Sequence, residues 1–269
     1  MKVVRRLPHP GRGFTQGLLA GPDDSVLEST GLYGQSQLRR YRLGSDSYQA
    51  SATLSEDFFG EGICQVGDSI WQLTWRERTA LRWDAATLEL RDLVSYSREG
   101  WGICGDAAGG DLVTSDGTSE LVRRDPDTLQ PREVIKVRCQ GERVQGLNDL
   151  AWSAGRVWAN VAPTSAIVGI DPGTGDVTDL VDASAAAEPR MVDPQAIMNG
   201  IAALPRSAEV AGVTGVAGVG GSGASPGADP GDFLLTGKGW RWLREVRLVP
   251  ARGRTEPRRL LEGAGRFFF

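Results

Sequence analysis

The chain has 269 residues, with 30 basic and 34 acidic side chains and a formal net charge of −4. This near balance argues against a basic surface for nucleic acid or for a membrane, and no apolar run reaches the length of a membrane span. The single histidine, His9, excludes a histidine-rich zinc site. A Ser-His-Asp triad would have to use this one residue, which we expect in an exposed N-terminal arm.

Cysteine is sparse in this chain. Cys64, Cys104 and Cys139 form no CxxC pair, so neither a disulfide scaffold nor a zinc ribbon is indicated. We expect all three to be small buried residues. The first residues lack the apolar segment of a signal peptide, so the cytoplasm is the expected compartment; a misassigned start codon would change that expectation to export.

In chain order, the first strand-length apolar segment is Val3 to Leu7, and a short phrase then recurs five times. Each copy has a polar or aromatic residue, then usually Gly, then Leu or Ile, at intervals of 45, 40, 47 and 51 residues. The copies are Gln16-Gly17-Leu18, Glu61-Gly62-Ile63, Trp101-Gly102-Ile103, Asn148-Asp149-Leu150 and Asn199-Gly200-Ile201. Repeats of this length are typical of propeller blades.

Turns and strands keep the same period. Turns begin at Asp84, Asp125 and Asp171, and strand-length runs such as Ile70 to Trp75 and Val157 to Val161 lie between the phrases. Helical periodicity is nearly absent, and Leu180 to Ala187 is the best candidate for a helix. These features predict an all-β fold, a five-bladed β-propeller. We expect Val3 to Leu7 to pair into the last blade and close the ring.

The predicted propeller covers residues 1–250. Residues 206–232 are almost entirely Gly, Ala, Val and Ser, which predicts a flexible loop insertion in the fifth blade rather than an extra hairpin. Residues 251–269 form a C-terminal tail that is basic and ends in three phenylalanines. This tail either caps the mouth of the channel or lies free.

The repeat predicts that polar and aromatic side chains gather at one end of the channel. In a propeller the innermost strands line a central channel, so Gln16, Glu61, Trp101, Asn148 and Asn199 should meet at one end of it. The strands that follow end in a second set, which is Thr30, Thr74-Trp75, Ser115-Asp116, Asn160 and Lys238. Strand parity turns Trp71, Trp83, Trp152 and Trp158 away from the channel, into the core between blades. Amides, a carboxylate, an ammonium and indoles suit a small polar ligand held against aromatic walls.

A family resemblance rests on an ordered set of motifs. They are FTQGL (14–18), ESTGLYGQSQLRR (28–40), FGEGI (59–63), QLTW (72–75), EGWGI (99–103), SDG (115–117), LNDL (147–150), NGIA (199–202) and TGK (236–238). From about Pro8 to Leu248 the chain resembles the plant and bacterial glutaminyl-peptide cyclotransferases, which are five-bladed propellers. This resemblance is independent of the repeat spacing, and both predict the same fold.

The resemblance implies an activity. Members of this family convert the N-terminal glutamine of a peptide or protein into pyroglutamate and release ammonia, without zinc or another cofactor. Carried onto the matching motifs, Glu61 is the general acid/base, and Lys238 and Asn148 are polar groups of the site that would stabilise an oxyanion. Gln16 would bind the substrate within walls formed by Phe14, Phe59, Trp75 and Trp101. The partners are then peptides with N-terminal glutamine, and we expect a monomer.

Two positions depart from the family pattern. The family commonly has ANVWQT where this chain has ANVAPT, so Ala162 removes one aromatic wall. LNDL stands in place of LNEL, so the Asp149 side chain is one methylene shorter. We expect these changes to affect substrate affinity or preference and to leave the proposed catalytic set intact.

Three other functions also fit a propeller. A non-catalytic propeller would bind N-terminal residues or small amides, and Ala162 is its best support. A calcium-dependent, lactonase-like propeller would take oxygen ligands from Glu61, Asn148, Asn199 and Asp116, although Lys238 opposes a divalent ion in that site. A WD-repeat scaffold is least consistent with the sequence, because the GH and WD phrases are missing.

Overall fold

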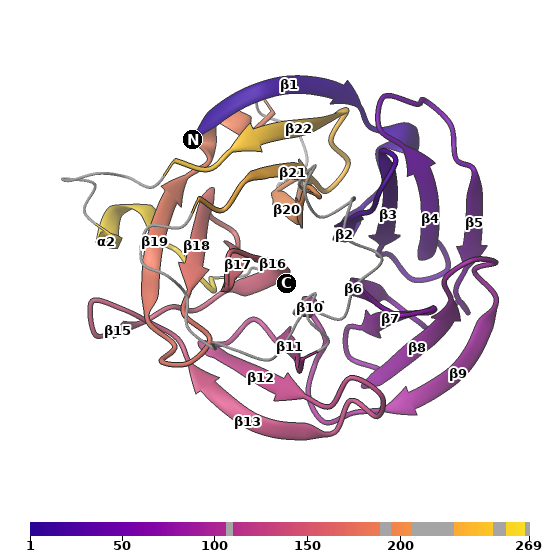
Figure 1. The fold of residues 1–269 in the computed structure, drawn as a ribbon, viewed down its shortest axis with the longest axis horizontal. Helices are drawn as coiled ribbons and strands as arrows, with labels where there is room; N and C mark the ends of the chain where they lie inside the picture. Colours follow the sequence, from indigo (N-terminus) through magenta and orange to yellow (C-terminus); the bar gives the residue numbers. More distant parts are fainter. Residues whose placement is uncertain (106–109, 189–194, 206–228, 250–256, 267–269) are drawn as a thin grey trace, which may run out of the picture.

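The computed structural model describes residues 1–105, 110–188, 195–205, 229–249 and 257–266. Five four-stranded antiparallel sheets stand around a central axis like blades (Figure 1). The prediction of a five-bladed β-propeller is therefore confirmed. Each blade begins at the axis with the strand that carries the repeated phrase or directly follows it.

The first three blades follow the chain outwards from the axis. Blade 1 comprises β2 (Thr15–Ala20), β3 (Ser25–Thr30), β4 (Gln37–Arg42) and β5 (Ala50–Thr53). Blade 2 comprises β6 (Gly60–Val66), β7 (Ser69–Thr74), β8 (Thr79–Asp84) and β9 (Leu90–Ser95). Blade 3 comprises β10 (Ile103–Gly105), β11 (Leu112–Ser115), β12 (Glu120–Arg124) and β13 (Pro131–Lys136).

Blade 4 has the same order, and blade 5 is completed by the N-terminus. Blade 4 comprises β16 (Leu147–Ser153), β17 (Arg156–Val161), β18 (Ala166–Ile170) and β19 (Val177–Asp182). Blade 5 comprises β20 (Met198–Ala203), β21 (Asp232–Gly237), β22 (Trp242–Arg247) and β1 (Lys2–Pro8). A small hairpin of β14 (Arg138–Cys139) and β15 (Glu142–Arg143) precedes blade 4.

Helical structure is limited to single turns in the described residues. They are the 3-10 turns η1 (Pro10–Arg12) and η2 (Ser184–Ala186) and the short helix α2 (Pro257–Leu260). The expected helix over Leu180 to Ala187 is wrong, because its first half pairs with β18 as part of β19 and only η2 follows. No helix in this described part is long and apolar enough to cross a membrane.

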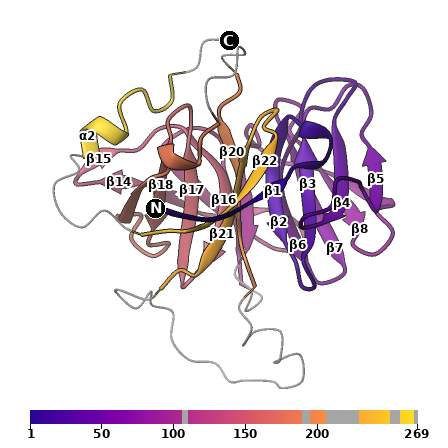
Figure 2. The same cartoon turned by 90° about the horizontal axis from the view of Figure 1, so that it is seen from above.

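Two expectations fall partly outside the described residues. Of the Gly/Ala-rich segment 206–232, residues 206–228 are not described. Of the tail, residues 257–266 are described, and they include α2, which lies at one end of the propeller beside blade 4 (Figure 2). There Leu260, Leu261 and Ala264 pack against apolar side chains of blades 3 and 4.

The ring is closed by β1, as the sequence predicts. β1 pairs antiparallel with β22 from Lys2 opposite Arg247 to Pro8 opposite Trp242. The last blade therefore combines one strand from the N-terminus with three from the C-terminal part of the chain, and β1 is its outermost strand.

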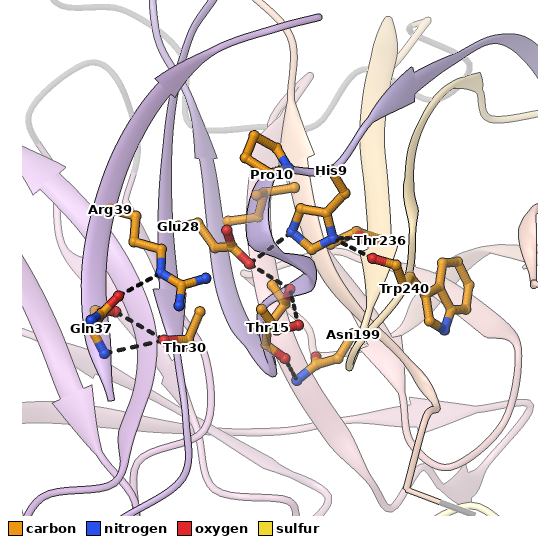
Figure 3. A network of polar contacts seen from close by, with 12 residues as sticks. His9, Pro10, Thr15, Glu28, Thr30, Gln37, Arg39, Asn199, Thr236 and Trp240 are labelled. Atoms are coloured by element: carbon orange, nitrogen blue, oxygen red, sulfur yellow. Dashed lines mark hydrogen bonds and ion pairs between the residues drawn. The ribbon is translucent and has the colours of Figure 1, made fainter. Parts of the chain in front are cut away.

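His9 follows β1 directly and is buried at the seam between blades 5 and 1. Its side chain contacts the main-chain oxygen of Trp240 in blade 5 and the carboxylate of Glu28 in blade 1 (Figure 3). The expectation that His9 is an exposed arm residue is wrong, since it is only 4% exposed. The physical reason is the ring closure, because pairing of β1 with β22 leads the chain straight into this seam.

Apolar side chains fill each of the five interfaces between neighbouring blades. Separate clusters lie between blades 1 and 2, 2 and 3, 3 and 4, 4 and 5, and 5 and 1. Trp71, Trp83 and Trp158 are buried in these clusters as expected, and Trp152 packs half-buried against one of them. The three cysteines are buried, also as expected, and none of them forms a disulfide.

The recurring turns have a common chemistry. In each, a side-chain oxygen of Asp84, Asp125 or Asp171 accepts main-chain N–H groups two and three residues further on. Such turns satisfy main-chain donors locally and explain why aspartate recurs at this repeat position.

The repeated phrase marks the point where inner strands approach the axis most closely. A Cβ added at Gly17 would lie 2.8 Å from the Cα of Gly62, and one added at Gly62 would lie 2.7 Å from the Cα of Gly102. Strand register also shifts at this point in β2, β6, β16 and β20. These β-bulges turn the residue before the glycine out of the regular ladder, which allows it to point along the channel.

We predict that Gly62→Ala destabilises the propeller by about 2 kcal/mol, because the new methyl group would meet main-chain atoms that have no room to move. Chemical denaturation measures the effect. Gly21→Ala is the matched control, since its Cβ would meet Ser25 at an ordinary 3.6 Å. Equal stability of the two variants would contradict this account of the axis.

Candidate active site

A cavity of about 370 Å³ opens at one end of the central channel. All eight residues that the sequence assigns to the site line it, which are Phe14, Gln16, Phe59, Glu61, Trp75, Trp101, Asn148 and Lys238. All five blades contribute to this set, so the whole ring forms the cavity.

Two kinds of local structure position these side chains. Gln16, Glu61 and Asn148 lie on inner strands at the β-bulges, and Trp101 lies just before the inner strand β10. Phe14 and Phe59 come immediately before inner strands, whereas Trp75 and Lys238 come immediately after the neighbouring strands. Because adjacent strands are antiparallel, the start of the first and the end of the second lie at the same end of a blade.

Glu61 lies deep in the cavity and is held by an amide chain. Its side chain is 4% exposed, and its Oε1 accepts a hydrogen bond of 3.1 Å from Gln16 Nε2. Gln16 Oε1 in turn accepts one of 2.7 Å from Asn199 Nδ2. The donor from Asn199 fixes which end of the Gln16 amide is oxygen, so the amide nitrogen faces Glu61.

The surroundings of Glu61 favour the protonated form of its carboxyl group. Burial raises the pKa of Glu61 well above its ordinary value. The positive charge of Lys238 lowers this pKa, whereas the negative charges of Asp149, Glu77 and Glu99 raise it further. A carboxyl group with such a pKa can both accept and return a proton near neutral pH.

Lys238 reaches the cavity from the end of β21. Its Nζ lies 4.9 Å from the centroid of the Phe14 ring, close enough for a cation–π interaction. The site thus places one ammonium group and one high-pKa carboxyl group in the same cavity.

Aromatic rings form one wall, and two carboxylates position them. Phe59 makes ring contacts with both Phe14 and Trp75, at centroid distances of 6.2 and 5.4 Å. Glu99 Oε2 accepts from the indole N–H of Trp75 at 3.1 Å and from that of Trp101 at 3.4 Å. Glu77 likewise accepts from the Phe59 main-chain N–H and from the Tyr33 hydroxyl. Glu99 belongs to the EGWGI motif but was not predicted to be a site residue, and Glu77 was not predicted from the sequence at all.

Comparison with known proteins shows the family of this chain. The family model described as glutamine cyclotransferase matches residues 1–217, most of the chain. The chain belongs to the glutamine cyclotransferase family.

Two relatives show how far the similarity extends. A glutaminyl-peptide cyclotransferase from Arabidopsis thaliana is 35% identical over 178 residues, which are 66% of this chain. The match spans 55% of the length of that relative. The crystal structure of Myxococcus xanthus glutaminyl cyclase superposes with a TM-score of 0.76 at 32% identity, covering 93% of this chain and 97% of the other.

Other residues that line the cavity were not predicted from the sequence. They are Leu32, Pro163, Gln195, Ile197 and Arg266. They come from loops and from the C-terminal tail, where no repeat position marks them. Arg266 is exposed, so it lies on the solvent side of a cavity in which Glu61 is buried.

The departure from the family at Ala162 has a structural counterpart. Ala162 is fully buried, its main-chain oxygen accepts a hydrogen bond of 2.9 Å from Gly265 N–H, and it is not among the lining residues. The neighbouring Pro163 and the tail residue Arg266 line the cavity instead. The described part of the tail therefore covers the side of the cavity where the family commonly has a tryptophan and this chain has Ala162.

Asp149, the second departure, lies behind the site rather than in its lining. It occupies the phrase position that is glycine in the other four blades, and it is fully buried. Its Oδ2 accepts main-chain N–H groups from Leu18 at 3.2 Å and from Ile201 at 2.8 Å. Burial raises the pKa of Asp149 well above its ordinary value, although these N–H donors oppose the rise.

The remaining residues predicted near the channel have other contacts. Thr30, Ser115 and Asn160 are buried, and Asp116 pairs with Arg98 at 2.9 Å; none of these lines the cavity. The ion pair of Asp116 with Arg98 occupies one of the oxygen ligands of the calcium alternative. Among the described residues, no group of three or more His, Cys, Asp or Glu is placed to hold a metal ion.

We predict that Asp149→Ala lowers the free energy of unfolding by about 2–4 kcal/mol, because two buried N–H groups lose their acceptor. Asp149→Asn keeps an acceptor oxygen for the main-chain N–H groups, so it should cost much less. Urea denaturation of both variants at pH 7 distinguishes them. Equal losses would mean that the charge, and not the acceptor, stabilises the axis.

Proposed function

We propose that this protein is a glutaminyl-peptide cyclotransferase, with Glu61 as its general acid/base. The observation that carries the proposal is the buried Glu61 carboxyl group, with its raised pKa, in a cavity that it shares with Lys238 and Asn148. Family membership supports the reaction class. The substrates would be peptides or proteins with N-terminal glutamine.

The reaction is an intramolecular acyl transfer. The α-amine of the glutamine attacks its own side-chain amide carbon, a new C–N bond forms, and a tetrahedral intermediate results. The old C–N bond then breaks and ammonia leaves. Because nucleophile and electrophile belong to one residue, the cavity needs only to select the folded side-chain rotamer. Aromatic walls such as Phe59 and Trp75 are suited to exclude water from it.

Glu61 addresses both proton transfers. An α-amine has a pKa of about 7.7–8.0 and is largely protonated at neutral pH, and an amide ion is a very poor leaving group. One carboxylate can take a proton from the attacking nitrogen and deliver it to the departing nitrogen, which contributes roughly 10²–10⁴-fold. The hydrogen bond from Gln16 engages Oε1, so we assign the transfer to Oε2.

Lys238 and Asn148 are the groups that we assign to the oxyanion of the intermediate. Lys238 supplies charge, and the buried amide of Asn148 supplies a neutral donor in the same cavity. Preorganised donors of this kind are each worth about 3 kcal/mol in the transition state.

We predict that Glu61→Gln abolishes ammonia release from a Gln-initiated peptide. Mass spectrometry measures the loss of one ammonia by the wild type and by the variant, with a chelator-treated wild-type sample expected to react normally. A fully active Glu61→Gln enzyme would exclude the mechanism. Tight binding of the peptide by the wild type without reaction would favour a binding propeller.

Stability is the control for this variant. In the folded protein the pKa of Glu61 is raised above 4.5, so the contribution of this group to stability is fully present below that pH and is lost as the pH rises through the folded pKa. Gln does not titrate. Glu61→Gln should therefore unfold at the same temperature as the wild type at pH 8, or at a higher one.

We predict that Lys238→Ala lowers kcat by about 10²–10³-fold with a smaller change in KM, because an oxyanion develops only in the transition state. Steady-state kinetics with a Gln-initiated peptide test this. Lys136→Ala, at an exposed lysine of the outer strand β13, is the control. An unchanged kcat with a raised KM would assign Lys238 to substrate binding instead.

A further inference from the structure

A second polar network lies behind the catalytic amide chain and contains the only histidine of the protein (Figure 3). Glu28 on β3 is fully buried, and its Oε1 accepts from His9 Nε2 at 2.9 Å and from Thr15 Oγ1 at 2.7 Å. His9 Nδ1 lies 2.8 Å from the main-chain oxygen of Trp240. His9 and Thr15 therefore meet at one carboxylate, and His9 links it to Trp240, which is distant in sequence.

The partners of His9 define its charge. A main-chain carbonyl can only accept, so Nδ1 carries a proton, and Nε2 faces a carboxylate oxygen that also accepts from Thr15. Both ring nitrogens are then donors, and His9 is an imidazolium. Burial alone would lower the pKa of His9, but the charge and hydrogen bond of Glu28 outweigh it and the pKa is raised. Burial likewise opposes ionisation of Glu28, yet the interactions with His9 and Thr15 lower its pKa.

Thr15 connects this pair to the catalytic chain. It is fully buried and immediately precedes Gln16, at the bulge where the register of β2 shifts. The Thr15 main-chain oxygen accepts from Asn199 Nδ2 at 3.3 Å, and the same amide nitrogen donates to Gln16 Oε1 at 2.7 Å. A bulge lacks regular ladder pairing, so side-chain bonds such as Thr15 to Glu28 determine where its residues point.

We propose that the buried His9–Glu28 pair positions Gln16 for catalysis by holding the hydroxyl of Thr15, and so fixes the hydrogen bond from Gln16 to Glu61. His9 and Glu28 are positioning residues, since neither lines the cavity. The inference rests on the proposed role of Glu61. It adds that residues at the seam between blades 5 and 1 determine the position of the Gln16 amide beside Glu61.

Thr15→Val is the decisive variant, because it removes the hydroxyl and leaves both members of the charged pair in place. We expect kcat on a Gln-initiated peptide to fall about tenfold, the effect of one lost positioning hydrogen bond, with KM little changed. Thr15→Ser keeps the hydroxyl and should restore kcat. Thr236→Val is the matched control, since its Oγ1 lies 3.4 Å from His9 Nδ1 on the other side of the seam and donates to the main-chain oxygen of Trp242 in blade 5. It should retain the wild-type kcat.

The pH profile separates positioning from a loss of folded protein. Donation from Gln16 favours the ionised form of Glu61, so Thr15→Val should move the acidic limb of kcat to higher pH. Lys238, Asp149, Glu77 and Glu99 also act on Glu61 and are unchanged in this variant. A lower kcat with no shift of the acidic limb along the pH axis would mean that Thr15 has only a structural role.

The outcomes distinguish the two proposals. An inactive Glu61→Gln enzyme together with wild-type kcat and pH profile in Thr15→Val overturns the inference alone. Equal losses in Thr15→Val and Thr236→Val overturn it as well. A fully active Glu61→Gln enzyme overturns the proposed function and the inference with it.

Discussion

The closest approach of the inner strands at the axis is the constraint on which the site depends. Glycines at successive repeat positions let the main chains of Gly17, Gly62 and Gly102 come together at distances that leave no room for a Cβ atom. In blade 4 the glycine is replaced by Asp149, whose carboxyl group binds main-chain N–H groups of the neighbouring inner strands. This tight centre brings the residue before each glycine within reach of its counterparts.

The same geometry produces two buried carboxyl groups with different uses. Both Glu61 and Asp149 have raised pKa values, and burial is the main cause in each case. Asp149 is occupied by main-chain donors, which suits it to hold the axis together. Glu61 receives a side-chain donor at one oxygen and lines the cavity. These two acidic residues lie 88 positions apart (149 − 61). The groups around each carboxyl suit Asp149 to a structural role and Glu61 to a chemical one.

Ring closure and the site are coupled. The chain Asn199–Gln16–Glu61 starts in blade 5, passes through blade 1 and ends in blade 2, so it crosses the seam that β1 closes. His9 and Glu28 lie at that seam and share Thr15 with the bulge that presents Gln16. A propeller must close for its last blade to contribute to the channel, and here closure also aligns the donor to the central carboxyl group.

The sequence alone determined the five-bladed fold and the eight residues that line one cavity. The repeat places Gln16, Glu61, Trp101 and Asn148 at equivalent distances from the axis, whereas Phe14 and Phe59 were assigned through the family resemblance. Their catalytic roles remain proposals. Only the tertiary structure decided that His9 is buried and charged, that Asp149 binds main-chain N–H groups, and that Arg266 and Pro163 line the cavity near Ala162. Each of these depends on three-dimensional contacts between residues that the repeat does not relate to one another, and such contacts leave no periodic signal.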